Sequence, residues 1–259
     1  MEEPMKKLYV ILMLLMVGCL TACSGKKDNA KQKSGDGTSA AKATEEAQAT
    51  SEVEEEGEEV YHIVKPEKAE QTESYEKNET IAIIHVEKYG DIYLKFFPDE
   101  APKAVENFIT HAREGYYDGI TFHRIVDGSF IQGGDPAGDG TGGESIWGEP
   151  FEDEFSEEIL PIRGALCMAN AGANTNGSQF FIVQSKDSYE GYFDQFDLTE
   201  EQKEKFKEYG GTPWLKGVHT VFGHVFKGMD VVDAIAAAET GLNDMPANPI
   251  VIEKIEIQN

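Results

Sequence analysis

Short apolar runs separated by Gly, Pro and Asp occupy the chain from about Thr80 to its C-terminus, a pattern typical of short β-strands. Residues 81–88 and 92–97 predict two strands, and the turn residues 89–91 between them indicate a hairpin. A folded domain therefore begins near Thr80. Further strands are predicted at residues 120–126, 129–135, 164–170, 179–184, 221–228 and 249–258.

Two stretches carry apolar residues at helical spacing instead. In the first, apolar side chains recur three and four positions apart from Val105 to Ala112, and Gly115 ends the pattern. Residues 229–238 form the second. Many short strands with only two main helices predict a mostly β fold, a barrel or a sandwich, in which few strand edges stay exposed.

A further stretch, residues 185–213, is rich in Glu and Lys, which favours a helix. Thr199 followed by Glu200 and Glu201 is a good helix start, because a Thr side chain accepts a hydrogen bond from the unpaired amides of the first turn. We therefore expect a third helix that begins after Thr199.

The N-terminus has the features of an export signal. Lys6 and Lys7 precede an apolar run at residues 8–17, and Cys23 closes the tetrapeptide Leu-Thr-Ala-Cys. The run is shorter than the roughly 20 apolar residues that span a bilayer, so we expect a signal peptide over residues 1–22. The tetrapeptide resembles the bacterial lipobox, which implies lipidation of Cys23. A plain signal peptide or an uncleaved anchor is the alternative.

Residues 23–78 are rich in Ala, Thr, Ser, Lys and above all Glu. They predict a disordered tether, because little apolar surface is available to offset the entropy of ordering. Over the whole chain 48 acidic residues face 23 basic ones, a formal charge of -25. Such a balance argues against nucleic acid as a partner, since phosphates are bound by Lys and Arg. The acidic run at residues 52–60 is interpreted as a solvated spacer, with recruitment of cationic partners or calcium as the alternative.

Three separated motifs carry the main functional signal. They are FHRIVDGSFIQGGD at residues 122–135, MANAGANTNGSQFFIV at 168–183 and WLKGVHTVFGHV at 214–225. In this order they resemble the cyclophilins, a family of peptidyl-prolyl cis-trans isomerases. The resemblance implies a closed eight-stranded antiparallel β-barrel capped by two α-helices over residues 79–259, with residues 185–213 as a helical insertion.

The reaction of this family determines what chemistry the site needs. Rotation about a peptide bond has a barrier of about 18 to 20 kcal/mol, because the nitrogen lone pair is delocalised into the carbonyl group. A catalyst needs no nucleophile, metal or cofactor, but it must stabilise the twisted bond more than either planar isomer. The resemblance implies that Arg124 donates to the prolyl nitrogen and steadies the carbonyl oxygen. A structural ion pair is the alternative role for Arg124.

The resemblance also implies which residues surround the substrate proline. Phe130, Phe181, Leu215 and His219 would line an apolar slot with Phe122 behind them, and ordinary core packing is the alternative for each. The remaining implied contacts are Gln132, Asn170 and Gln179 to the substrate backbone, Ala169 and Ala171 beside the residue before proline, Trp214 at the rim, and Gly140 and Thr141 in a Gly-rich loop beside the groove.

One departure from the family pattern affects the pocket. Most relatives have Phe directly after the positions of Asp127 and Gly128, whereas this chain has Ser129 followed by Phe130. Neighbouring strand residues face opposite ways. Either the turn shifts so that Phe130 fills the pocket floor, or Phe130 keeps its own place and the floor is shallower.

Other residues with reactive side chains suggest no second chemistry. Cys167 lies in an apolar run and is interpreted as a buried core residue rather than a catalytic thiol. The six histidines show no spacing typical of a metal site, so neither a metal nor a cofactor is expected. Residues 185–213 lead directly into Trp214, where they either shape the groove or decorate the surface.

Together these features predict a lipid-anchored prolyl isomerase on the outer face of a bacterial cell membrane, acting on proline-containing unfolded or exported polypeptides. A proline-binding or chaperone module with little turnover is the alternative, which Ser129 keeps open. The resemblance further implies a cyclosporin-type inhibitor as a ligand, because Trp214 has the indole position.

Overall fold

The computed structural model describes residues 71–72 and 79–259 of the chain. The predicted signal peptide, Cys23 and most of the predicted tether lie outside the described residues. Within the described part, every helix is too short or too polar to cross a membrane.

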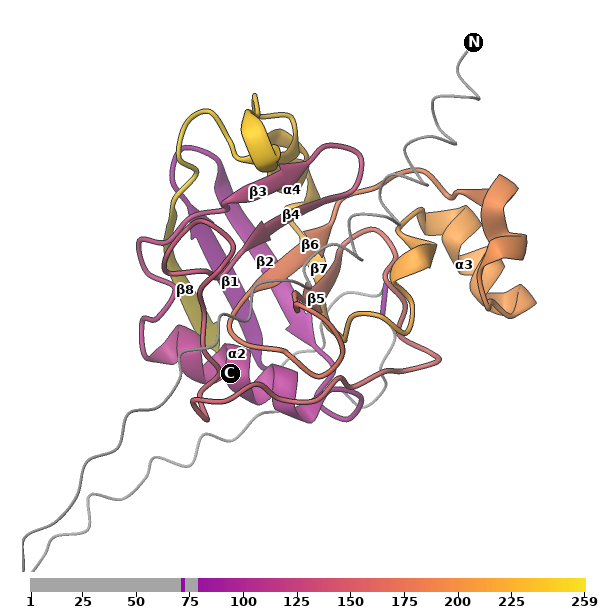
Figure 1. The fold of residues 1–259 in the computed structure, drawn as a ribbon, viewed down its shortest axis with the longest axis horizontal. Coiled ribbons are helices and arrows are strands. Elements are labelled where there is room, and N and C mark those ends of the chain that lie inside the picture. Colours follow the sequence, from indigo (N-terminus) through magenta and orange to yellow (C-terminus); the bar gives the residue numbers. More distant parts are fainter. Residues whose placement is uncertain (1–70, 73–78) are drawn as a thin grey trace, which may run out of the picture. The chain divides into compact units, whose positions relative to one another are not determined.

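Eight antiparallel strands form one curled sheet in the order β3-β4-β6-β5-β7-β2-β1-β8 (Figure 1). They lie where the sequence predicts strands, and β1 and β2 form the predicted hairpin, in which Ile81 pairs with Lys95. The strands are β1 Ile81–Val86, β2 Gly90–Phe96, β3 Arg124–Val126, β4 Phe130–Gly133, β5 Ala165–Met168, β6 Phe180–Val183, β7 Val221–Lys227 and β8 Ile252–Gln258.

The two edge strands, β3 and β8, are linked by a short backbone contact rather than by a ladder of their own. Thr121 forms an isolated antiparallel bridge with Val251, and the Phe122 amide donates to the Ile250 carbonyl at 3.0 Å. β3 is therefore shorter than predicted, because residues 120–122 pair toward β8 instead of continuing beside β4. The structure shows a curled eight-stranded sheet, and its pairing does not show the fully closed barrel that the resemblance implies.

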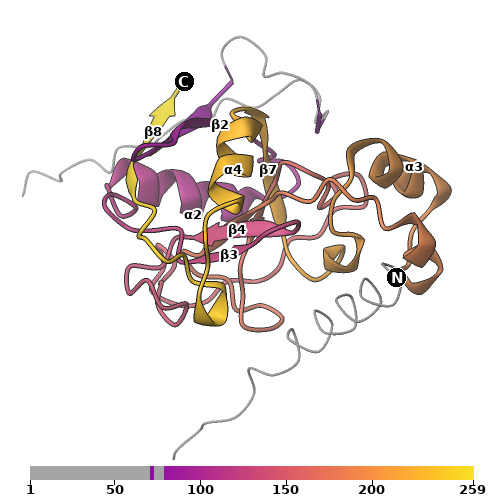
Figure 2. The same cartoon turned by 90° about the horizontal axis from the view of Figure 1, so that it is seen from above.

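Two helices pack on the sheet, as the apolar spacing predicts. α2 (Pro102–Arg113) lies against β7 and β8, and α4 (Met229–Ala236) lies against β2, β3 and β4 (Figures 1 and 2). α2 has no side-chain cap of its own. Instead, the amides of Lys103 and Ala104 donate to the Glu154 carboxylate at 3.1 and 3.0 Å. This carboxylate satisfies unpaired amides and suits the helix dipole, so a distant loop fixes the start of α2.

The sheet buries side chains on both of its faces, because alternate residues of a strand point in opposite directions. In β6, Phe180 and Ile182 belong to the larger apolar core, whereas Phe181 and Val183 belong to a second apolar cluster. Phe108 of α2 packs into the larger core, with its ring 5.2 Å from that of Phe180. The strand β6 therefore contributes side chains both to the main core and to the second cluster on the opposite face of the sheet.

The insertion predicted at residues 185–213 is helical. It contains the 3₁₀ helix η1 (Glu190–Gln195) and α3 (Glu200–Tyr209), which lie apart from α2 and α4 in both views (Figures 1 and 2). The Thr199 hydroxyl accepts from the Gln202 amide at 3.2 Å, and the Gln202 side chain accepts from the Thr199 amide at 3.0 Å. This reciprocal capping box confirms the predicted helix start.

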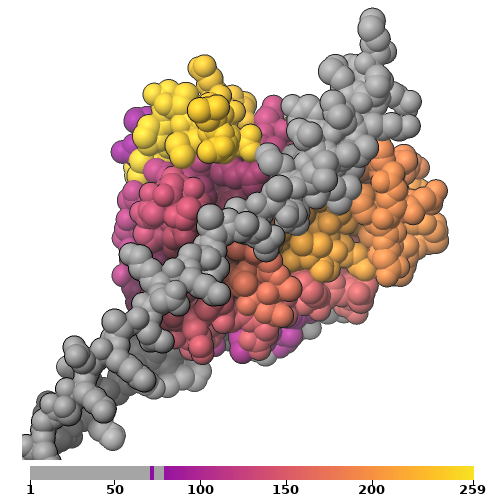
Figure 3. Space-filling model, in the orientation of Figure 1, coloured from indigo at the N-terminus to yellow at the C-terminus, as the bar shows by residue number. Residues whose placement is uncertain are grey.

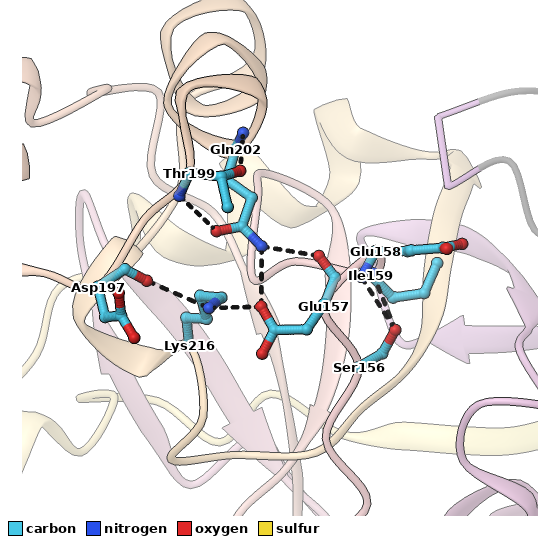
Figure 4. Close-up of polar contacts among 8 residues, drawn as sticks. All are labelled: Ser156, Glu157, Glu158, Ile159, Asp197, Thr199, Gln202 and Lys216. Atoms are coloured by element: carbon cyan, nitrogen blue, oxygen red, sulfur yellow. Dashed lines mark hydrogen bonds and ion pairs between the residues drawn. The ribbon is translucent and has the colours of Figure 1, made fainter.

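Polar contacts tie the insertion to the loop before β5 (Figure 4). The side-chain amide of Gln202 donates to the Glu157 carbonyl at 2.8 Å and to its carboxylate at 3.1 Å. Lys216 Nζ lies 2.8 Å from the same carboxylate. The insertion is held in addition by a small apolar core, which contains Leu160, Ile162, Phe193 and Phe206.

Gln71 packs against this same region from the N-terminal side. Its Nε2 donates to the Leu160 carbonyl at 2.5 Å, and its Oε1 accepts from the Leu160 amide at 2.9 Å. The side chain is buried. The folded part therefore includes a residue that lies before the domain start predicted at residue 79.

Candidate active site

The strand register brings four of the predicted site residues to one face of the sheet. Arg124 lies opposite Gln132 in the β3–β4 ladder, and Gln132 lies opposite Phe181 in the β4–β6 ladder. Paired residues of antiparallel strands point to the same face. Phe130 is two residues from Gln132 and shares that face.

The departure at Ser129 leaves this register intact. The β3–β4 ladder runs to the pair Val126–Phe130 without a shift. Phe130 is half-buried, and its ring centroid lies 5.3 Å from that of Phe181. Ser129 is buried, and its carbonyl accepts from the Gln184 amide at 2.7 Å. Of the two alternatives, Phe130 keeps its own place in the strand.

The predicted lining residues gather in the second apolar cluster. The His219 ring lies edge-on to Phe181, with the ring centroids 5.2 Å apart. Phe122 is the exception, because it is fully buried in the larger core, 6.2 Å from the ring of Phe180. It lies behind the site rather than at its surface. The predicted residues that the cluster brings together are Phe130, Ala169, Phe181, Trp214 and Leu215.

His219 is held as a neutral ring. Its Nδ1 lies 3.0 Å from the Met168 carbonyl oxygen. Because a carbonyl oxygen only accepts, Nδ1 is the donor, and in the neutral ring Nε2 is the unprotonated nitrogen. Burial lowers the pKa of His219, against smaller raising effects of the Met168 carbonyl and Asp153. The ring is uncharged at neutral pH, which suits an apolar slot.

Arg124 is anchored at one side of its guanidinium group. Its Nε donates to Asp244 Oδ2 at 3.3 Å, and its Cζ lies 5.1 Å from the centroid of the Phe130 ring. Among the described residues, neither NH1 nor NH2 has a hydrogen-bond partner. The Arg124 and Asp244 side chains are 36% and 38% exposed. The ion pair proposed as an alternative role exists, but it leaves the terminal donors available to a ligand.

Two of the predicted polar residues are joined to each other. Gln132 Nε2 donates to Gln179 Oε1 at 2.9 Å. Gln179 in turn donates to the carbonyls of Gly140 and Gly142, at 3.2 and 2.8 Å. The Gly-rich loop thus lies beside this pair, while Thr141 is exposed and bonds to Asp139 within the loop. Amide groups therefore line the site next to Arg124.

Asn170 and Ala171 lie in the loop that follows β5. The Asn170 side-chain amide donates to Asp153 Oδ1 at 3.2 Å and to the Val218 carbonyl at 3.4 Å. The Ala171 amide donates to Thr175 Oγ1 at 2.9 Å, and Ala171 is exposed. The Asn170 side chain is engaged in fixing this loop, and Ala171 lies at its surface.

Two residues that contact the site were not identified from the sequence. Asp244, the partner of Arg124, lies in the turn-rich segment before β8. Tyr189, from the insertion, lies edge-on to Trp214 with ring centroids 4.6 Å apart. The position of the insertion just before Trp214 was a signal for the second contact. Nothing in the sequence indicated the first.

Cys167 belongs to the cluster that lines the site, but it is a core residue of that cluster and not a reactive group. Cys167 is fully buried in the second cluster, and burial raises the pKa of its thiol well above the usual value. Its interpretation as a core residue is confirmed. Within residues 79–259, His, Cys, Asp and Glu side chains nowhere gather in a group of three that could hold a metal.

Among the described residues, the terminal donors of Arg124 are unpaired and lie beside a cluster of aromatic rings and amide groups. The family profile described as "Cyclophilin type peptidyl-prolyl cis-trans isomerase/CLD" matches residues 81–257. The chain belongs to the cyclophilin-type peptidyl-prolyl cis-trans isomerase family.

Several bacterial relatives share about half of the aligned residues. A Staphylococcus saprophyticus protein is 52% identical over 183 residues, which cover 70% of this chain and 92% of the relative. A Staphylococcus epidermidis protein is 50% identical over 184 residues, which cover 70% and 93%. Both names describe candidate peptidyl-prolyl cis-trans isomerases.

Solved structures with this fold include a cyclophilin type peptidyl-prolyl cis-trans isomerase from Cryptosporidium parvum. It is 33% identical, with a TM-score of 0.58, and the match covers 70% of this chain and 98% of that one. The same protein was also crystallised in the presence of the dipeptide Ala-Pro, with a TM-score of 0.57. The chain is therefore an isomerase by family, and its fold is that of the cyclophilins.

Proposed function

We propose that this cyclophilin-type isomerase accelerates X-Pro rotation in exported proteins, with Arg124 as the catalytic residue. The observation that carries the proposal is the arrangement of Arg124: its NH1 and NH2 have no partner among the described residues, and it lies over Phe130. The Phe130 ring contacts Phe181, whose ring contacts His219, so the aromatic groups continue from the guanidinium. A proline ring packed on these aromatic groups brings its amide next to the guanidinium.

The proposed mechanism is electrostatic. As the amide twists, the prolyl nitrogen regains its lone pair and becomes an acceptor, which neither planar isomer offers. A donor that gains a partner only in the twisted state lowers the barrier. A hydrogen bond from a charged group contributes about 1.5–3 kcal/mol, which corresponds to roughly ten- to a hundredfold in rate.

The test is exchange between the cis and trans forms of a short Ala-Pro peptide, followed by NMR with the full chain present. We expect the wild type to accelerate exchange and Arg124→Ala to lose most of the acceleration. Absence of acceleration by the wild type would overturn the proposed function.

A proline-binding module with little turnover is the second candidate. The contact between Arg124 and Asp244 favours it, because the carboxylate offsets part of the charge available to the substrate. Peptide binding, followed by chemical-shift changes of the same Ala-Pro peptide, separates the two candidates. Binding without faster exchange supports the module.

Export and lipid anchoring are part of the proposal, supported by Lys6, Lys7, the apolar run and the tetrapeptide that ends at Cys23. We expect the full chain, expressed in a bacterial host that processes lipoproteins, to fractionate with membranes and to incorporate labelled palmitate. Cys23→Ser should abolish the label and release the protein. Cys19→Ser is the matched control and should retain the label.

Closure of the sheet is also proposed, through the contact of residues 119–122 with residues 250–252. It is supported by the Thr121–Val251 bridge and the hydrogen bonds around it. The Phe122 and Ile252 amides should then exchange with solvent as slowly as those of the central strands. Fast exchange at both amides would indicate an open sheet.

Binding of a cyclosporin-type inhibitor is proposed from Trp214, which packs against the second cluster. Titration with the drug should change Trp fluorescence, and it should do so equally in Trp147→Phe, because Trp147 packs on Phe151 instead. A change that disappears with Trp147 would argue against binding at the site.

A further inference from the structure

We infer that Asp244 is a positioning residue for isomerisation: it orients the guanidinium of Arg124 through Nε, so that NH1 and NH2 point to the substrate amide. This inference rests on the proposed role of Arg124. The contact is direct, since Arg124 Nε donates to Asp244 Oδ2 at 3.3 Å. The two residues lie 120 positions apart in the chain.

Asp244 lies in a tight, closed turn of the backbone. The segment closes on itself through the bridge Thr240–Pro246 and the Gly241 amide, which donates to the Met245 carbonyl at 2.8 Å. Within it, Asn243 and Asp244 both have φ of 59°, in the left-handed region. Few L-residues adopt this conformation, and Asn and Asp adopt it most readily.

The same segment leaves its apolar side chains outside. It contains the short 3₁₀ helix η3 (Leu242–Asp244), which contacts β3. In Figures 1 and 3 it is the yellow segment that protrudes beside β3. Leu242 is 91% exposed and Met245 is exposed as well, whereas Asp244 is half-buried against Arg124. Packing of apolar groups therefore does not explain the conformation, and the half-buried side chain of the segment is the one that contacts Arg124.

The contact restricts how the guanidinium can rotate. A carboxylate at Nε and the Phe130 ring at 5.1 Å from Cζ hold the planar group from two directions. Arginine presents its donors in a rigid fork, so fixing Nε also fixes the directions of NH1 and NH2. A donor that is oriented before the reaction needs no ordering as the bond twists. Asp244 thus acts through Arg124 and not on the substrate.

If Asp244 had only a structural role, its substitution would have a different effect. Both side chains are more than one third exposed, and exposed ion pairs contribute little to stability. If Asp244 only fastened its segment to β3, its loss would change the melting temperature and leave turnover unchanged. If Asp244 contacted the substrate itself, KM would rise. If Asp244 positions Arg124, its loss lowers kcat.

The experiment compares kcat and KM for Ala-Pro peptide exchange in the full chain, for wild type, Asp244→Ala, Asp244→Asn, Arg124→Ala and the double variant. We expect Asp244→Ala to lower kcat about tenfold with KM close to wild type, and to lower the melting temperature as well, because Ala is strained at a φ of 59°. Asp244→Asn retains an acceptor oxygen and should lose less. The double variant should be no slower than Arg124→Ala alone, because both changes remove the same interaction.

Asp118→Asn is the matched control. It removes one negative charge from an exposed turn and should behave as the wild type. A second readout does not depend on turnover: the Arg124 Nε–H signal in NMR should exchange with water faster in Asp244→Ala than in Asp118→Asn.

Three results would overturn the inference. These are wild-type kcat in Asp244→Ala, a loss in the double variant equal to the product of the single losses, or an unchanged Nε–H exchange rate. A wild-type chain without any acceleration would instead overturn the proposed function, and the inference with it. If turnover falls in Arg124→Ala but not in Asp244→Ala, the proposed function stands and only the role of Asp244 is overturned.

Discussion

Arg124, Phe130 and Phe181 lie on adjacent strands of the sheet, whereas Asp244, Tyr189 and Trp214 come from connections between elements. In the first group, ladder hydrogen bonds and a buried second face fix each side chain. In the second group, a closed turn and an insertion with its own small core hold the residues. The sheet thus carries the residue that we propose to act on the amide. The connections supply groups that can vary without changing the fold.

The largest effect should come from the core beneath the sheet. Phe108 is fully buried and contacts the rings of Phe96, Tyr117, Phe180 and Phe222. Phe108→Ala should lower the free energy of unfolding by about 3–5 kcal/mol, measured by urea denaturation. In the insertion, Phe206→Ala should instead loosen α3 while the sheet stays folded, as seen by hydrogen exchange. Equal loss of protection in both regions would show that they unfold as one unit.

The second largest effect should come from acid, which lowers the free energy of unfolding through His224 in the sheet. His224 of β7 is buried, and burial lowers its pKa to about 3, with Lys95 as a smaller cause. The unfolded chain binds the proton at about 6.5. The stability contributed by neutral His224 is therefore complete above pH 6.5 and is lost as pH falls toward 3, by about 1.4 kcal/mol per pH unit.

Urea denaturation at pH 7 and pH 5 tests this dependence. The free energy of unfolding should fall by about 2 kcal/mol less in His224→Gln than in the wild type. The other buried histidines shift in the same direction, so the difference between the two proteins is the informative quantity. Identical pH dependence would show that His224 is not held neutral.

The network of the insertion should contribute less. Gln202→Ala removes its contacts with Glu157 and half of the capping box at Thr199, and we expect a loss of about 1–2 kcal/mol in the local stability of α3. Hydrogen exchange of the α3 amides measures it. Glu204→Ala, on the exposed face of the same helix, is the control and should have little effect. Similar values for both variants would argue against the network.

The smallest effect is expected where the insertion contacts the site. Tyr189→Ala should change the fluorescence of Trp214 and leave turnover of a short Ala-Pro peptide within about twofold, because Tyr189 does not contact Arg124 or Phe181. Tyr192→Ala is the control from the same insertion. A large loss of turnover in Tyr189→Ala alone would place the insertion in the catalytic part of the site.

Much of the sheet could be predicted from the sequence, because alternating burial and turn residues are local signals. The helix start at Thr199 was predictable for the same reason, whereas the reciprocal bond from Gln202 was not predicted. The shorter β3 was not, since residues 120–122 leave β4 to pair with a segment that lies far along the chain.

In the site, too, some residues could be predicted from the sequence and others could not. The motifs point to Arg124, Phe130 and Phe181, and the register explains why they meet. The contact of Arg124 with Asp244 depends on two left-handed residues in a turn of ordinary composition. Such long-range contacts leave no pattern in a single sequence.

The most direct measurement is the cis–trans exchange rate of an Ala-Pro peptide with the wild type and with Arg124→Ala at equal concentration. A loss of roughly ten- to a hundredfold, at unchanged melting temperature, is expected if the guanidinium stabilises the twisted amide. Equal rates for the two proteins would contradict that role.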